Sequence, residues 1–78
     1  MAAGSKQTGN AYENLANAII VQAAEDYRRL LKRAKKNPAK REALDEALQI
    51  ERFFRSGWYQ RLTNVDGEFL IHKLQKDI

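Results

Sequence analysis

The chain has 78 residues and no cysteine, so it is long enough for one small domain and excludes a disulfide framework or a thiolate metal site. Its fourteen lysines and arginines outnumber ten acidic residues, which gives a formal net charge of +4. His72 is the only histidine, no serine or threonine lies in a strand-to-helix elbow, and no glycine-rich phosphate loop occurs, so we expect no metal site, no cofactor and no enzymatic activity.

The apolar runs are short. The longest is Ala18-Ile19-Ile20-Val21, far below the roughly 20 apolar residues that a transmembrane helix needs. The first residues also lack the apolar core of a secretory signal. We therefore expect a cytoplasmic protein that does not contact a membrane.

Residues 1–9 are small or polar, and we expect them to form a disordered N-terminal tail ahead of a single helical domain over 10–78. From residue 10 to residue 36, apolar side chains recur at steps of three and four, which predicts a long first helix. Its apolar face comprises Tyr12, Ala16, Ile19, Ile20, Ala23, Tyr27, Leu30, Leu31 and Ala34.

The dipeptide Asn37-Pro38 is predicted to end this helix and to begin a second one, with Asn37 as the N-cap and Pro38 as the first helical residue. The second helix is expected to run to about Arg55 and to pack antiparallel on the first as a helical hairpin. Its apolar face comprises Ala43, Leu44, Ala47, Leu48, Ile50 and Phe54.

Glu51 falls within the apolar face of the second helix. A carboxylate buried there needs a cation or a hydroxyl partner, because an unpaired buried charge is costly. Tyr12, Tyr27 or a nearby arginine could supply that partner.

The segment after Arg55 is open to two interpretations. Ser56-Gly57 can end the second helix, through Gly57, or cap a short helix over 58–63, through Ser56. Asp66 can then cap a last helix over 68–76. Alternatively, Asp66-Gly67 is typical of a β-hairpin turn that would pair 58–63 with 69–74. Because apolar residues do not alternate cleanly through 69–71, we favour helices.

Eight of the fourteen basic residues lie between positions 28 and 41, where no acidic residue occurs, while the rest of the chain carries six basic and ten acidic residues. A local basic patch is typical of a polyanion partner, since a surface that only maintains solubility usually mixes both signs. The alternative is the solvated face of an amphipathic helix. The candidates for binding nucleic acid or another anionic partner are Arg28, Arg29, Lys32, Arg33, Lys35, Lys36, Lys40 and Arg41.

Four of the aromatic residues fall within positions 53–59. Large aromatics of so small a domain usually form its core, and we expect Trp58 to be buried against the hairpin beside Phe54 and Leu62. The alternative is a surface for a protein partner, for which the candidates are Phe53, Arg55, Trp58, Tyr59 and Arg61.

Two segments resemble a signature of small uncharacterised proteins from prophages and mobile elements of Gram-positive bacteria. The first is Ala18-Ile19-Ile20-x-Gln22-Ala23-x-x-Asp26-Tyr27-Arg28, and the second is Phe53-Phe54-Arg55-Ser56-x-Trp58-Tyr59-x-x-Leu62-Thr63-x-x-Asp66-Gly67-Glu68-Phe69-Leu70-Ile71. The resemblance implies a phage or mobile-element accessory protein, of a kind associated with nucleic acid or with the inhibition of host defence.

Together these patterns predict an all-α fold, a long antiparallel helical hairpin with one or two short C-terminal helices. The function they favour is a non-enzymatic protein that binds nucleic acid or a nucleoprotein complex through its basic residues. The alternative is a small inhibitor of an antiphage defence system, of the anti-CRISPR or anti-restriction type, that binds a host protein. We expect a monomer, and the alternative is a homodimer formed through the first helix, where Leu15 and Val21 leave apolar surface.

Overall fold

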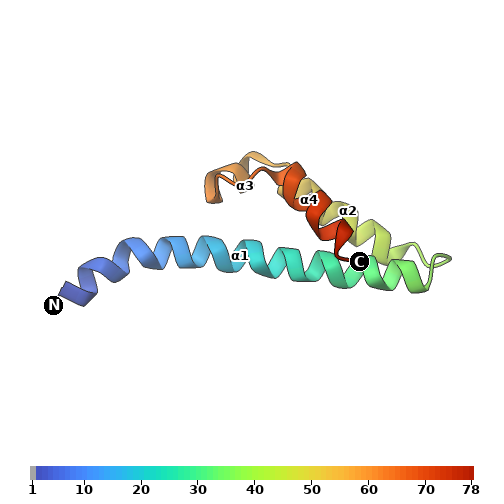
Figure 1. Cartoon of the computed structure of the whole chain (residues 1–78), viewed down its shortest axis with the longest axis horizontal. Helices are drawn as coiled ribbons and strands as arrows, with labels where there is room; N and C mark the ends of the chain where they lie inside the picture. Colours follow the sequence, from blue (N-terminus) through green and yellow to red (C-terminus); the bar gives the residue numbers. More distant parts are fainter. Residues whose placement is uncertain (1) are drawn as a thin grey trace.

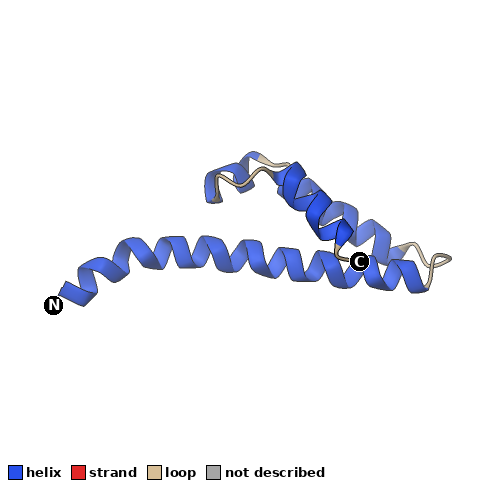
Figure 2. Ribbon diagram, in the orientation of Figure 1, coloured by secondary structure: helices blue, strands red, loops and turns tan. Residues whose placement is uncertain are grey.

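Helices make up most of the computed structural model, which describes residues 2–78 and the side chains from residue 11 onward. The elements are α1 (Ala2–Lys36), α2 (Glu42–Phe54), α3 (Gly57–Leu62) and α4 (Gly67–Lys76) (Figure 1). The all-α hairpin with two short C-terminal helices is therefore confirmed. No strand occurs between residues 2 and 78, so the alternative of a β-hairpin in the C-terminal segment is wrong (Figure 2).

The first helix extends further toward the N-terminus than its apolar pattern indicates. It begins at Ala2, whereas the sequence pattern placed its start near residue 10. The disorder predicted for residues 1–9 concerns residues whose side chains are not described, so it stays a prediction. The apolar face that organises the fold begins later, with the buried side chain of Ala16.

The connection between α1 and α2 differs from the prediction. The amide of Asn37 still donates to the carbonyl of Arg33 at 3.0 Å, and the amide of Lys40 donates to the carbonyl of Asn37 at 3.0 Å, which forms a turn. Helix α2 begins only at Glu42, after Arg41, whose side chain makes no capping bond. Asn37 is therefore not an N-cap, because two antiparallel helices need a few non-helical residues between them to reverse direction.

Two of the predicted caps are confirmed. The hydroxyl of Ser56 accepts the amide of Tyr59 at 3.2 Å, and the carboxylate of Asp66 accepts the amide of Phe69 at 3.2 Å. Each bond satisfies an N–H group that the first turn of a helix leaves free. Gly57 is the first residue of α3, and α2 ends at Phe54 with Arg55 as its C-cap, so the alternative in which Gly57 ends the second helix is wrong.

Gly67 marks a close approach of two helices. A Cβ atom added to it would lie 2.0 Å from the carbonyl oxygen of Phe54, the last residue of α2. Only glycine lets the first turn of α4 pack this tightly against the end of α2. The contact fixes the position of α4 over the hairpin.

The core lies where α2, α3 and α4 meet α1. Tyr27 packs edge-on against Phe54 with ring centroids 5.9 Å apart, and Phe54 packs edge-on against Tyr59 at 5.6 Å. Such edge-to-face pairs are favoured by the charge distribution of aromatic rings. The buried side chains of this cluster are Tyr27, Ala47, Phe54, Tyr59, Ile71 and Leu74.

Trp58 is not part of this core, and the prediction that it is buried is wrong. Its side chain is 60% exposed, whereas that of the adjacent Tyr59 is 1% exposed. Because Ser56 caps α3, the helix begins in a phase that turns Tyr59 toward the hairpin, and Trp58 lies about 100° away around the helix axis.

The edges of the predicted apolar faces are also more exposed than expected. Leu44 and Leu48 of α2 are exposed, and so is Tyr12 of α1. The apolar arc on each helix is broader than the surface that the short partner helices cover. Leu15 and Val21 are exposed as well, and they stay the surface on which the predicted alternative of a homodimer depends.

Candidate nucleic-acid interface

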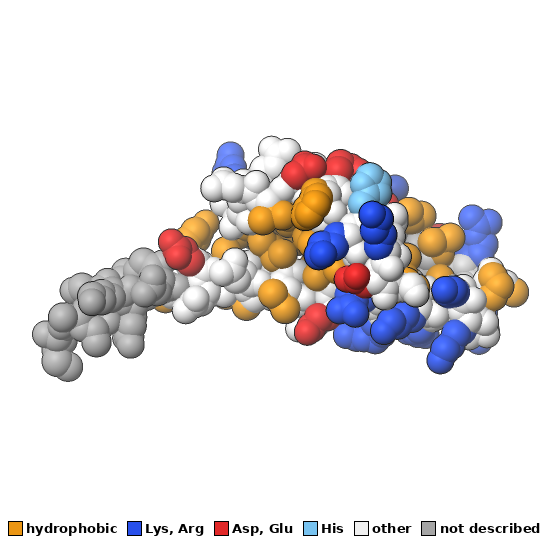
Figure 3. Space-filling view, viewed as in Figure 1, with side chains coloured by type: hydrophobic (Ala, Val, Ile, Leu, Met, Phe, Trp, Pro, Cys, Tyr) orange, Lys and Arg blue, Asp and Glu red, His pale blue; other side chains and the backbone are white. Residues whose placement is uncertain are grey.

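The eight basic residues between Arg28 and Arg41, hereafter the basic end, occupy the last turns of α1 and the connection to α2. Seven of the eight side chains are exposed, and Arg28 is half-buried. Lys40 and Arg41 lie in the connection, and the other six lie on α1. The space-filling view shows Lys and Arg side chains gathered along this stretch of α1 (Figure 3).

These charges are almost free of ion pairs. Arg29 pairs with Asp26 at 2.8 Å, and Asp26 also accepts a hydrogen bond from Gln22 at 3.0 Å. Within the part of the chain that the structure describes, the other seven basic side chains make no ion pair. The Nε atom of Arg28 is buried and has no hydrogen-bond partner there. The positive charge of the basic end is therefore not neutralised by the fold itself.

Three open surface hollows include residues of the basic end; one of them, lined by Arg29 and Arg33, also has Asp26 and Glu46 in its lining, and the other two have no acidic residue. Of these two, the first has a volume of about 440 Å³ and is lined by Arg29, Lys32, Arg33, Lys35, Lys36 and Ile78. The second has a volume of about 540 Å³ and is lined by Leu31, Ala34, Lys35, Pro38, Lys40, Arg41 and Leu44. Each places several cations around one concave surface, an arrangement suited to phosphate groups.

The C-terminal end of α4 adjoins the basic end. The side-chain amide of Gln75 donates to the hydroxyl of Tyr27 at 3.0 Å, and Ile78 lines the first hollow. Lys73 and Lys76 are exposed in the last turns of α4. Sequence reasoning missed these two lysines as members of the site. Their positive charge was visible, but nothing local indicated that α4 ends beside α1.

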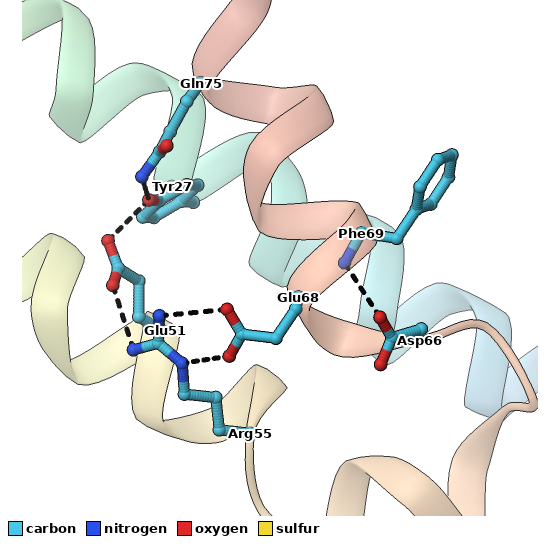
Figure 4. Close-up of polar contacts among 7 residues, drawn as sticks. All are labelled: Tyr27, Glu51, Arg55, Asp66, Glu68, Phe69 and Gln75. Carbon is cyan, nitrogen blue, oxygen red and sulfur yellow. Dashed lines mark hydrogen bonds and ion pairs between the residues drawn. The ribbon is translucent and has the colours of Figure 1, made fainter.

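A second set of polar and charged residues connects the helices to one another. Tyr27, Glu51, Arg55, Glu68 and Gln75, hereafter the polar cluster, join α1, α2 and α4 (Figure 4). The hydroxyl of Tyr27 donates to Glu51 at 2.6 Å, Arg55 donates to Glu51 at 3.2 Å, and Arg55 forms a two-pronged pair with Glu68. The expectation that Glu51 has a hydroxyl or arginine partner is confirmed, with both present.

The electrostatics of the polar cluster follow from these contacts. Burial, together with the hydrogen bond to Glu51, raises the pKa of Tyr27 from 10.0 to about 12. The guanidinium of Arg55 holds the pKa of Glu68 below its usual value. Every charged member has a partner of opposite sign or a hydrogen bond, so the cluster has a structural role.

The candidate residues for a protein partner are separated by the fold. Phe53 is half-buried against Phe54 and Tyr59, and Tyr59 is buried. Arg55 belongs to the polar cluster. Of the five candidates, Trp58 and Arg61 therefore remain as exposed side chains without such a role.

Among the side chains described from residue 11 onward, no three His, Asp or Glu residues lie close enough to hold a metal ion. Within residues 2–78 no helix combines the length and the apolar character needed to cross a membrane. Comparison with known proteins found no matching family model, no matching curated protein and no matching solved structure.

Proposed function

We propose that the protein is a non-enzymatic phage or mobile-element accessory protein that binds nucleic acid, alone or in a nucleoprotein complex, through the basic end. The observation that supports this is the excess of exposed, unpaired cations there, with one ion pair among eight side chains. The assignment to a phage or mobile element is supported only by the sequence resemblance described above.

The physical argument concerns what unpaired cations do. Like charges held together repel one another, and only one of the eight cations of the basic end is offset by an ion pair. A phosphate backbone neutralises such charges and releases its condensed counterions, which favours binding. Arginine adds two-pronged contacts to phosphate oxygens, and lysine adds a compact charge.

A matched pair of variants tests the proposal. Lys32→Gln with Lys35→Gln removes two charges from the basic end, and Arg52→Gln with Arg61→Gln removes two exposed charges from α2 and α3. Both variants have the same net charge. Affinity for a labelled DNA duplex, followed by fluorescence anisotropy, is measured between about 50 and 200 mM salt.

We expect the slope of log affinity against log salt to fall by about 1.8 in the first variant, since each lost phosphate contact removes about 0.9. The second variant should retain the wild-type slope. Equal slopes in the two variants would show that binding depends on net charge rather than on the basic end. Absence of binding by the wild type at the lowest salt, to the duplex and to single-stranded DNA and RNA alike, would reject the proposed function.

A second candidate, a protein-binding inhibitor of a host defence system, is favoured by one observation. Trp58 is 60% exposed on α3, and exposed tryptophans often dominate the free energy of protein interfaces. For this candidate, affinity capture from a nuclease-treated host lysate should yield one partner with the wild type and none with Trp58→Ala. Capture that is lost on nuclease treatment would favour the nucleic-acid function instead.

A further inference from the structure

The outer face of α4 combines an exposed aromatic ring with positive charge. Phe69 is 60% exposed, although a phenyl ring loses favourable free energy when it stays in water. Together with His72, Lys73 and Lys76 it lines a surface hollow of about 220 Å³. The steps of three and four residues place these side chains on one face of the helix.

The C-terminal end of α4, after Lys76, lies beside the basic end. Ile78, just beyond α4, lines the same hollow as Lys32 and Lys35 of α1. In the space-filling view, Lys and Arg side chains lie both over α4 and along the adjoining stretch of α1, on the same side of the molecule (Figure 3). A ligand that follows the basic end can therefore extend onto α4.

The acidic residues near this face leave its cations available. Glu68 is engaged by Arg55, on the side of α4 that packs toward α2. Asp77 is exposed beyond the last turn, and neither Lys73 nor Lys76 forms an ion pair with it or with any other described residue. The hollow around Phe69 thus presents one ring and positive charge, with no acidic side chain in its lining.

We propose that the outer face of α4 binds single-stranded nucleic acid, with Phe69 stacking on a base and Lys73 and Lys76 contacting the flanking phosphates. This proposal rests on the proposed function, because the basic end is expected to hold the rest of the strand. Aromatic rings beside a positively charged groove are the usual elements of single-strand binding. In a duplex the bases are already stacked on one another, so an exposed ring on a helix gains little there.

Phe69→Ala and Phe69→Leu test the ring, and Trp58→Ala is the control because Trp58 has the same exposed fraction but lies on α3. The probes are oligothymidylate, oligouridylate and a DNA duplex. We expect both Phe69 variants to bind the single strands about tenfold more weakly, with duplex affinity unchanged. Leucine retains apolar bulk without a ring, so a loss in Phe69→Leu identifies stacking. The two single strands show whether DNA or RNA is preferred.

Fluorescence gives a direct readout, because Trp58 is the only tryptophan of the chain. In a Trp58→Phe, Phe69→Trp protein, binding of oligothymidylate should quench the emission, since the new indole stacks on a base. In the wild type, Trp58 emission should not change. Far-UV circular dichroism checks that both proteins are folded.

The outcomes separate the two proposals. If Phe69→Ala binds single strands as the wild type does, while Lys32→Gln with Lys35→Gln weakens that binding, the inference about α4 is overturned and the proposed function stands. Duplex binding that is as tight as single-strand binding, with no quenching at position 69, also overturns the inference. If the wild type binds none of the three probes at low salt, both proposals fail.

Discussion

Two regions of this small molecule use charge in opposite ways. In the polar cluster, Arg55 donates to Glu51 and to Glu68 of α4, and Glu51 also accepts from Tyr27 of α1. In the basic end, only one of the eight cations forms an ion pair among the described residues: Arg29, with Asp26. The comparison teaches that the charges used by the fold are paired with one another between helices, whereas those left unpaired are available to a partner.

The same contrast applies to the aromatic side chains. Tyr27, Phe54 and Tyr59 are buried and pack edge-on where α2, α3 and α4 meet α1. Trp58 and Phe69, by contrast, are each 60% exposed. Substitutions in the first region should therefore change the free energy of unfolding, and substitutions in the second should change binding alone.

The largest effect is expected at Tyr59. Tyr59→Ala should lower the free energy of unfolding by about 3–5 kcal/mol, because it leaves a cavity beside Phe53 and Phe54. Trp58→Ala, one residue earlier, should lower it by less than about 1 kcal/mol. Urea denaturation followed by circular dichroism measures both. Equal losses would show that α3 is in a different phase from the one described.

The next largest effect on stability is expected at Gly67, which is compared with Gly57 because each is the first residue of a helix. Gly67→Ala should destabilise the fold by about 1–3 kcal/mol, because its Cβ meets the carbonyl of Phe54. Gly57→Ala meets no atom within 4 Å and should be neutral or stabilise by up to about 1 kcal/mol. The thermal midpoint should fall in Gly67→Ala and should stay the same or rise in Gly57→Ala. A neutral Gly67→Ala would contradict the tight packing of α4 on α2.

The buried tyrosine hydroxyls differ in their partners. Tyr27→Phe should cost about 1–2 kcal/mol, because Glu51 and Gln75 each lose a hydrogen bond. The hydroxyl of Tyr59 is buried without a partner among the described residues, so Tyr59→Phe should cost nothing or stabilise the fold. Denaturant unfolding of both variants measures the difference, and equal costs would contradict the role of the polar cluster.

The raised pKa of Tyr27 adds a pH dependence to the same region. Because the folded state retains the phenolic proton more tightly than the unfolded state, this stabilisation is fully present below pH 10 and is lost as the pH rises from 10 to about 12. The loss should approach about 1.4 kcal/mol for each pH unit in that window. Tyr27→Phe should show a shallower decline than the wild type, and parallel curves would contradict the assignment.

The smallest effect on stability is expected in the basic end. Lys32→Gln with Lys35→Gln should change the free energy of unfolding by less than about 0.5 kcal/mol, because both side chains are exposed and unpaired. The same variant is the one expected to weaken nucleic-acid binding. A large loss of stability would show that these lysines serve the fold and would remove the contrast between the two regions.

Features that depend on near neighbours in the chain were predictable from the sequence. The periodicity of apolar residues indicated the helices, and Ser56 and Asp66 were identifiable as caps because a cap bonds to an amide three residues on. The need of Glu51 for a partner followed from its place within an apolar face. The local excess of cations over 28–41 was likewise visible, since it requires only counting.

Other features were decided by the tertiary structure. The burial of Tyr59 rather than Trp58 depends on the phase in which α3 begins and on the space beside Phe54, neither of which a local pattern contains. The need for glycine at position 67 arises from a backbone in another helix. The position of the C-terminal end of α4 beside the basic end exists only because α4 folds back over the hairpin. Contacts between residues distant in sequence leave no trace in local periodicity.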